Sequence, residues 1–209
     1  MSSITIIGSG NMARGIGTRA AAAGYGIQVL DRDPSNAAAL AGDLSSATSG
    51  ALGEAPAGDI VVLALPYGAV AEVVRQYGAA LDGKVLVDIT NPVDFQTFAG
   101  LVTPPDSSAA QEIAKLVPGA KVVKAFNTTF ASTLVDGTVD DQPLDVLIAG
   151  DDEAAKASVA TFIEAAGLRP LDVGPLAQAH WLEGIGFLHI GLQVSKGWGW
   201  NTAVKVIGV

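Results

Sequence analysis

The segment Gly8-Ser9-Gly10-Asn11-Met12-Ala13 has residue types and a spacing that suit dinucleotide binding. In this G-x-G-x-x-A pattern, Gly8 permits a tight turn, Gly10 lets a pyrophosphate approach the backbone, and Ala13 allows a helix to pack closely on a strand. An apolar run precedes the pattern and an Ala-rich stretch follows it, so N–H groups at the start of a helix would face the phosphates. A tight turn without a ligand is the alternative, and the strand-to-helix context favours the dinucleotide.

Three charged residues, Asp31-Arg32-Asp33, follow the second apolar run, where the adenine ribose of a dinucleotide would lie. A carboxylate there accepts hydrogen bonds from the ribose hydroxyls and favours NAD, whereas an Arg pairs with a 2′-phosphate and favours NADP. A solvated loop cation is the alternative interpretation of Arg32. Because both residue types are present, these residues leave the choice between NAD and NADP open.

Two loops, Leu65-Pro66-Tyr67 and Asn91-Pro92-Val93, follow later apolar runs. Ligands of doubly wound folds bind beyond the carboxyl ends of parallel strands, so these loops are candidates to hold the ribose and nicotinamide of the cofactor. For each Pro taken alone, an ordinary loop terminator is the better explanation.

Apolar runs alternate with helical patterns along the whole chain, and several runs lack polar alternation, as is typical of strands buried on both faces of a parallel sheet. This order predicts an α/β fold with a doubly wound, mostly parallel sheet of Rossmann type, as a single domain over residues 1–209. The strands are expected at residues 4–8, 27–31, 60–66, 84–88, 121–126, 144–150 and 169–173, with a short one near 46–49. The helices are expected at residues 11–23, 35–44, 69–81, 107–116, 152–166 and 176–194.

The last of these helices differs from the others because its apolar residues cover more than one face. Such a helix usually buries both sides. We expect it to pack on the sheet and on a second copy of the chain, as a homodimer.

Composition narrows the function classes. The 209 residues include no Cys, which excludes a disulfide scaffold, thiolate catalysis and Cys-ligated zinc. A net charge of -9 with scattered Lys and Arg argues against nucleic-acid binding. The apolar run at residues 60–66 is too short to span a bilayer, and the first residues lack the basic region of a signal peptide, so a cytoplasmic protein with no membrane partner is expected.

Segments across nearly the whole chain together resemble the NADP-binding oxidoreductases typified by coenzyme F420-dependent NADP reductase. The matching segments are Gly8–Met12, Asp59–Pro66, Lys121–Thr128, Ala149–Asp152, Gly167–Leu176 and the pair Leu182-Glu183. The resemblance implies a dimeric Rossmann-type domain that passes a hydride between NADP and a deazaflavin. It places Ser9 to Met12 at the phosphates, Asp31 and Arg32 at the adenosine end, Leu65, Pro66, Tyr67 and Ala131 along the cofactor, and Asn201 near the second substrate.

Two departures from that family are visible. After the second strand the reductase has a hydroxyl residue and two arginines, and only the middle position is retained here, as Arg32. NAD therefore stays an alternative to NADP because of Asp31. The segment Trp198-Gly199-Trp200-Asn201 matches the family only loosely, and its two Trp side chains would reshape the pocket for F420 or a similar planar carrier.

Hydride transfer between stacked rings requires proximity, orientation and exclusion of water more than a titrating side chain, so no catalytic residue and no metal ligand is assigned. The spacing of His180 and Glu183 is compatible with an acid/base pair, although a hydrogen-bonded pair on a helix surface explains it better. We expect His189 to be buried at an interface.

A small carbonyl or imine substrate would require a proton donor, and then His180, His189 or Tyr67 would be the candidates. Besides hydride transfer to a planar carrier and reduction of a small carbonyl or imine, a third hypothesis for the function is a non-catalytic redox sensor that binds NAD(P).

Overall fold

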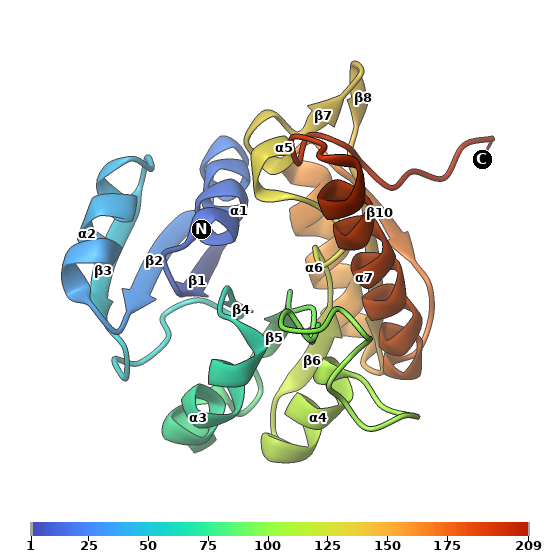
Figure 1. Cartoon of the computed structure of the whole chain (residues 1–209). Helices are drawn as coiled ribbons and strands as arrows, with labels where there is room; N and C mark the ends of the chain where they lie inside the picture. Colours follow the sequence, from blue (N-terminus) through green and yellow to red (C-terminus); the bar gives the residue numbers. More distant parts are fainter. Residues whose placement is uncertain (1, 209) are drawn as a thin grey trace.

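In the computed structural model, which describes residues 2–208, one eight-stranded sheet is covered by helices on both faces (Figure 1). The strand order is β10-β9-β6-β5-β4-β1-β2-β3. The strands are β1 (Ser3–Ile7), β2 (Gly26–Asp31), β3 (Ala47–Ala51), β4 (Ile60–Leu63), β5 (Val85–Asp88), β6 (Lys121–Lys124), β9 (Asp145–Gly150) and β10 (Arg169–Asp172). All neighbouring strands of this sheet pair in parallel except β6 and β9. The predicted doubly wound, mostly parallel sheet is thus confirmed.

The strands in the middle of the sheet are rich in Val, Ile and Leu because both of their faces are buried. Every residue of β4 and β5 is buried, and β9 is buried along its whole length. Parallel strands covered by helices on two sides exclude water from both faces, which explains the missing polar alternation.

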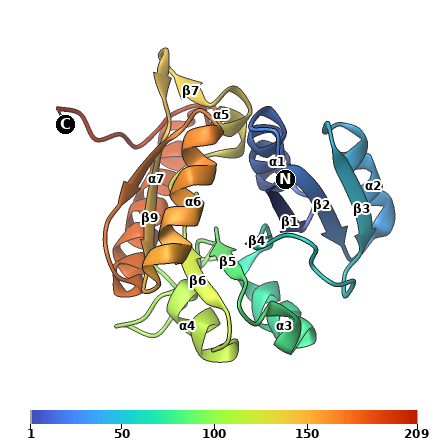
Figure 2. The same cartoon turned by 180° about the vertical axis from the view of Figure 1, so that it is seen from behind.

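Two groups of helices cover the two faces (Figure 2). The helices are α1 (Asn11–Ala22), α2 (Pro34–Gly42), α3 (Tyr67–Tyr77), α4 (Ala109–Leu116), α5 (Ala131–Asp136), α6 (Glu153–Ala165) and α7 (Ala179–Lys196). The first core cluster joins α1, α2, α5 and α6 to one face of the sheet, and the second joins α3, α4 and the start of α7 to the other face. None of the helices within residues 2–208 has the length and apolarity needed to cross a membrane.

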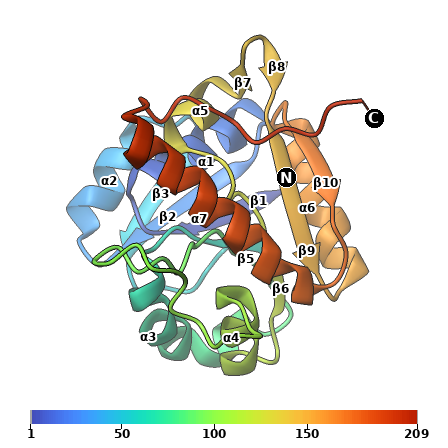
Figure 3. The same cartoon turned by 45° about the vertical axis from the view of Figure 1, so that its right-hand side comes forward.

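The last helix, α7, runs obliquely across its face of the sheet (Figure 3). Leu182 of its first half packs on Leu147 and Ala149 of β9. Ile190 of its second half packs on Val93 and Phe130, in loops beyond the carboxyl ends of β5 and β6. The helix therefore links the body of the sheet to the edge where ligands of this fold bind.

One connection differs from the prediction: α5 and a hairpin of β7 (Thr138–Val139) and β8 (Gln142–Pro143) were not anticipated. They join β6 to β9, and because β9 runs antiparallel to β6 the whole connection stays at the carboxyl edge. Residues Asp140 and Asp141 form the hairpin turn with φ values of 50° and 61°. Six-residue helices and two-residue strands show too few periods for sequence patterns to reveal them.

Candidate functional site

The glycine turn between β1 and α1 can be formed only by glycine at its first position. Gly8 has a φ of 107°, and a Cβ there would lie 2.3 Å from the carbonyl oxygen of Ala64. The N–H of Gly8 also donates to the carbonyl of Leu30 at 2.8 Å, which joins the turn to β2. Close approach of three strands therefore selects Gly8, as expected from the sequence pattern.

The N-terminus of α1 is open to an anion. Gly10 precedes the helix, no side chain caps the first turn and no acidic residue lies in it. A Cβ on Gly10 would meet no atom within 4 Å, so the backbone here is accessible. Uncapped N–H groups together with the helix dipole favour phosphate binding. The net charge of the protein does not prevent this, because the donors are backbone groups.

A cavity of about 310 Å³ lies on the adenosine side of the turn. Its lining includes the glycine turn, the end of β2 and the start of α3, in particular Gly8, Ser9, Gly10, Leu30, Asp31, Arg32, Leu65, Pro66, Glu72 and Gln76. The residues predicted to meet the adenosine are therefore brought together here with those predicted to bind phosphate.

The carboxylates beside Arg32 are both engaged by other groups. Asp31 accepts hydrogen bonds from Ser9 Oγ at 2.7 Å and from the N–H of Asp33 at 2.9 Å. Asp33 caps α2 by accepting from the N–H and the hydroxyl of Ser35, and these hydrogen bonds lower the pKa of Asp33. Within residues 2–208 the exposed Arg32 forms no ion pair. Arg32 is thus available to a phosphate despite its acidic neighbours.

A second cavity, of about 690 Å³, continues from the first past Gly10, Leu65 and Pro66, and we call it the nicotinamide-side cavity. Its lining residues are Gly10, Asn11, Met12, Ala64, Leu65, Pro66, Tyr67, Gly68, Ile89, Thr90, Asn91, Pro92, Val93, Phe95, Val102 and Ile190. No Asp, Glu, Lys, Arg or His is among them. Tyr67 is the one side chain of this lining that titrates, and burial, followed by the charge of Glu112, raises its pKa.

Met12 lines the nicotinamide-side cavity and also two adjoining cavities, of about 550 and 160 Å³. The larger is lined by Ala131, and both are bordered by Phe130 and Trp200. Asn201 is exposed and does not line any of these cavities, whereas its neighbour Trp200 lines two. The structure therefore groups the predicted residues along one groove, except for Asn201.

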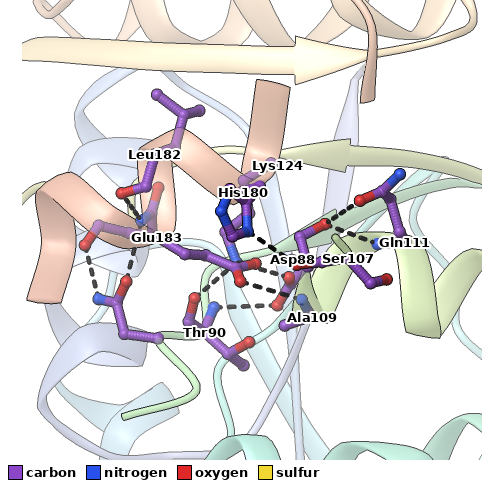
Figure 4. A network of polar contacts seen from close by, with 12 residues as sticks. Asp88, Thr90, Ser107, Ala109, Gln111, Lys124, His180, Leu182 and Glu183 are labelled. Carbon is purple, nitrogen blue, oxygen red and sulfur yellow. Dashed lines mark hydrogen bonds and ion pairs between the residues drawn. The ribbon is translucent and has the colours of Figure 1, made fainter. Parts of the chain in front are cut away.

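A fully buried ion cluster lies behind the groove (Figure 4). Lys124 Nζ lies 2.8 Å from Asp88 Oδ2, 2.7 Å from Glu183 Oε1 and 2.6 Å from the carbonyl oxygen of Thr90. Glu183 also accepts from the N–H of Ala109 at 3.0 Å. Burial raises the pKa of Glu183, against the opposing effect of the Lys124 charge. The cluster joins β5, β6, α4 and α7.

The expected pairing of His180 with Glu183 is wrong. His180 Nδ1 lies 2.9 Å from the carbonyl oxygen of Ser107, while Glu183 faces Lys124 in the core. His189 is buried, as expected, and its Nε2 lies 2.8 Å from Thr202 Oγ1; burial lowers its pKa. Neither histidine lines the four cavities described above.

Sequence reasoning did not assign Thr90, Asn127 or Phe130 to the site, and it named Trp200 only as one of two Trp side chains that would reshape the pocket of the second substrate. Asn127 lies three residues after the end of β6, just as Asn91 lies three residues after the end of β5. That signal was present for Asn127, whereas nothing local indicates that Trp200, far along the chain, returns to α1 and α5.

The fold and this groove define a Rossmann-type protein of the dinucleotide-binding class. Residues 3–92 match the family model described as NADP oxidoreductase, coenzyme F420-dependent. The F420-dependent NADP reductase of Methanothermobacter marburgensis is 30% identical over 206 residues, covering 90% of this chain and 91% of that protein. The chain therefore belongs to this family of NADP-dependent oxidoreductases.

Other similarities agree with that assignment. Metalloreductase STEAP3 of Rattus norvegicus is 34% identical over 184 residues, which are 87% of this chain but only 36% of that longer protein. A crystal structure from Arthrobacter sp. FB24 superposes with a TM-score of 0.89 and 28% identity, covering 100% of both chains. Imine reductase of Streptomyces aurantiacus, at 21% identity and a TM-score of 0.68, shares the fold.

Proposed function

We propose that this protein transfers a hydride between NADP(H) and coenzyme F420 or a similar planar electron carrier. The observation that carries the proposal is the lining of the nicotinamide-side cavity, which holds no charged side chain and no histidine. Transfer between two stacked rings requires alignment and exclusion of water, and apolar walls supply both. Family membership supports NADP as the donor, and the names of the reductase relatives support F420 as the acceptor.

Each part of the groove has a definite role in this reaction. The free N–H groups of α1 would bind the pyrophosphate, and Arg32 would pair with the 2′-phosphate. The loops at Leu65 and Asn91 would hold the ribose and ring, with Met12 lining both the nicotinamide-side cavity and the adjoining one. The bound dinucleotide supplies the hydride, so the chain itself has only to bind, orient and shield the two rings.

Reduction of a carbonyl or imine is less well supported by this site. That reaction needs a proton donor near the acceptor. In the nicotinamide-side cavity only Tyr67 titrates, and its raised pKa makes it a weaker acid.

The test is to mix the protein with NADPH and oxidised F420 and to follow the deazaflavin absorbance. We expect the F420 absorbance to fall together with that of NADPH. The Gly10→Asp variant should lose this activity, because it places a carboxylate where the pyrophosphate approaches, while Gly42→Asp should keep it. Both glycines have open space around a Cβ, so both variants should fold.

Tight NADPH binding without turnover of F420, flavins or quinones would contradict the proposal and favour a redox sensor. Turnover of imines or ketones in place of F420 would favour the other alternative.

We also propose that two copies of the chain pair through α7. Its solvent face exposes Trp181 and Leu188, each 66% accessible, and also Leu192. Gly184 and Gly191 lie between them in open space, so large and minimal side chains alternate on one stripe. Such a stripe is complementary to a second, antiparallel copy of itself, with the large residues of one helix over the glycines of the other.

A further inference from the structure

Two buried polar atoms beside the proposed nicotinamide position have no hydrogen-bond partner within residues 2–208. They are Thr90 Oγ1 and Asn127 Oδ1, and each residue is only 4% exposed. Thr90 lines the nicotinamide-side cavity, and Asn127 lines the adjoining cavity of about 160 Å³. Buried polar atoms are nearly always hydrogen-bonded in folded proteins, so two exceptions in one groove indicate a ligand that supplies the partners.

The orientation of the Asn127 amide is fixed by its neighbours. Its Nδ2 donates to Asn91 Oδ1 at 2.9 Å and to the carbonyl oxygen of Leu182 at 2.8 Å. A carbonyl oxygen only accepts, so the nitrogen must occupy this side and Oδ1 the other. Asn91 Nδ2 in turn donates to the Asn127 carbonyl at 2.7 Å. Asn127 Oδ1 is therefore held in place as an unused acceptor.

The backbone of Thr90 is held equally firmly by the ion cluster. Its N–H donates to Asp88 Oδ1 at 2.9 Å, and its carbonyl accepts from Lys124 Nζ at 2.6 Å, as Figure 4 shows. Both backbone groups are thus occupied, while the hydroxyl still has a proton to donate. The buried charges behind the groove thereby fix the position from which Thr90 acts.

The two cavities adjoin each other, and Met12, Ile89, Asn91 and Ile190 line both. We propose that Asn127 and Thr90 recognise the carboxamide of the bound nicotinamide ring. Asn127 Oδ1 accepts from the amino group of the carboxamide, and the Thr90 hydroxyl donates to its carbonyl oxygen. An acceptor and a donor match the two ends of a carboxamide, and two contacts at the ring's edge fix which ring face meets the second substrate. This inference rests on the proposed function.

Two NADP+ analogues test the two contacts separately by calorimetric binding. The 3-acetylpyridine analogue lacks the amino group but keeps the carbonyl, and the thionicotinamide analogue replaces the carbonyl oxygen by sulfur, a weaker acceptor. We expect the unmodified protein to bind each analogue about fivefold more weakly than NADP+. Thr90→Val should bind NADP+ about fivefold more weakly, no longer discriminate against the thionicotinamide analogue, and still discriminate against the acetylpyridine analogue. Asn127→Ala should show the reverse pattern.

Thr90→Val is the safer variant, since Oγ1 has no protein partner and its loss should not lower the melting temperature. If Asn127→Ala fails to fold, the result for Thr90→Val alone decides between the two outcomes. The matched control is Thr161→Val, on the exposed face of α6. Equal binding of NADP+ and both analogues by the unmodified protein, or unchanged discrimination in Thr90→Val, would overturn the inference. The adenosine fragment 2′,5′-ADP should bind all variants equally. Failure of the unmodified protein to bind this fragment would overturn the proposed function itself.

Discussion

Ser9 Oγ donates a hydrogen bond of 2.7 Å to Asp31 Oδ2 and so ties the glycine turn to the end of β2. The other oxygen of Asp31 accepts from the N–H of Asp33, whose own carboxylate caps α2. Both carboxylates next to Arg32 are therefore used within the protein. This arrangement leaves the guanidinium of Arg32 free at the proposed position of the 2′-phosphate, which favours NADP over NAD.

Arg32→Ala should weaken NADPH binding about tenfold or more and leave NADH binding unchanged, because a charge-assisted hydrogen bond to phosphate contributes about 1.5–3 kcal/mol. Titrations followed by intrinsic Trp fluorescence measure both affinities. Arg75→Ala removes another exposed arginine, on α3, and should change neither. Equal losses for NADPH and NADH in Arg32→Ala would show that Arg32 does not read the 2′-phosphate.

Lys124→Met should lower the free energy of unfolding by about 3–5 kcal/mol, because it leaves Asp88 and Glu183 fully buried without a cation. Denaturant unfolding measures this loss. Lys115→Met, which breaks an exposed pair with Glu112, should cost less than about 1 kcal/mol. Adding Glu183→Gln to Lys124→Met should restore part of the stability; no recovery would mean that the charge of Glu183 is not the source of the loss.

Stability should depend on Asp145 at low pH. Burial alone would raise the pKa of Asp145, but hydrogen bonds from Arg169, the N–H of Val206 and Lys205 lower it to about 2. A carboxyl with a depressed folded-state pKa contributes stability above its unfolded-state pKa, near 4, and loses it as pH falls toward the folded-state value. The contribution is about 2 kcal/mol at neutral pH.

Unfolding curves measured between pH 6 and pH 2 test this dependence. Asp145→Asn should be less stable at pH 6 and should show a shallower loss of stability below pH 4. Asp140→Asn, in the exposed hairpin turn, should match the unmodified protein throughout. Parallel curves for Asp145→Asn and the unmodified protein would show that Asp145 does not carry the acid dependence.

Leu188→Glu should convert the proposed dimer to a monomer, because it places a charge on each copy of the exposed stripe of α7. Light scattering after size exclusion should give about twice the 21.1 kDa chain mass for the unmodified protein and the single mass for the variant. Ile207→Glu, 82% exposed in the C-terminal tail, is the control and should stay dimeric. A monomeric unmodified protein would contradict pairing through α7.

The sequence by itself determined the parallel sheet, the glycine turn and the loops that border the nicotinamide-side cavity. These features leave a signal in short stretches of sequence: runs of Val, Ile and Leu indicate strands buried on two faces, and Gly8 stands where the backbone has a φ that other residues avoid. Carboxyl ends of parallel strands meet at one edge of the sheet, which is why Leu65 and Asn91 line the same cavity.

Only the tertiary structure decided the partner of Glu183, the free state of Arg32 and the return of Trp200 to the groove. Spacing on α7 suggested His180 as the partner of Glu183, but Glu183 faces Lys124, 59 residues away, because a buried carboxylate is stabilised by pairing with a buried cation. Likewise, the sequence places two carboxylates beside Arg32. Only the structure shows that Asp31 accepts a hydrogen bond from Ser9 and that Asp33 accepts one from Ser35. Long-range pairing of charges follows from three-dimensional proximity and burial, which local spacing does not encode.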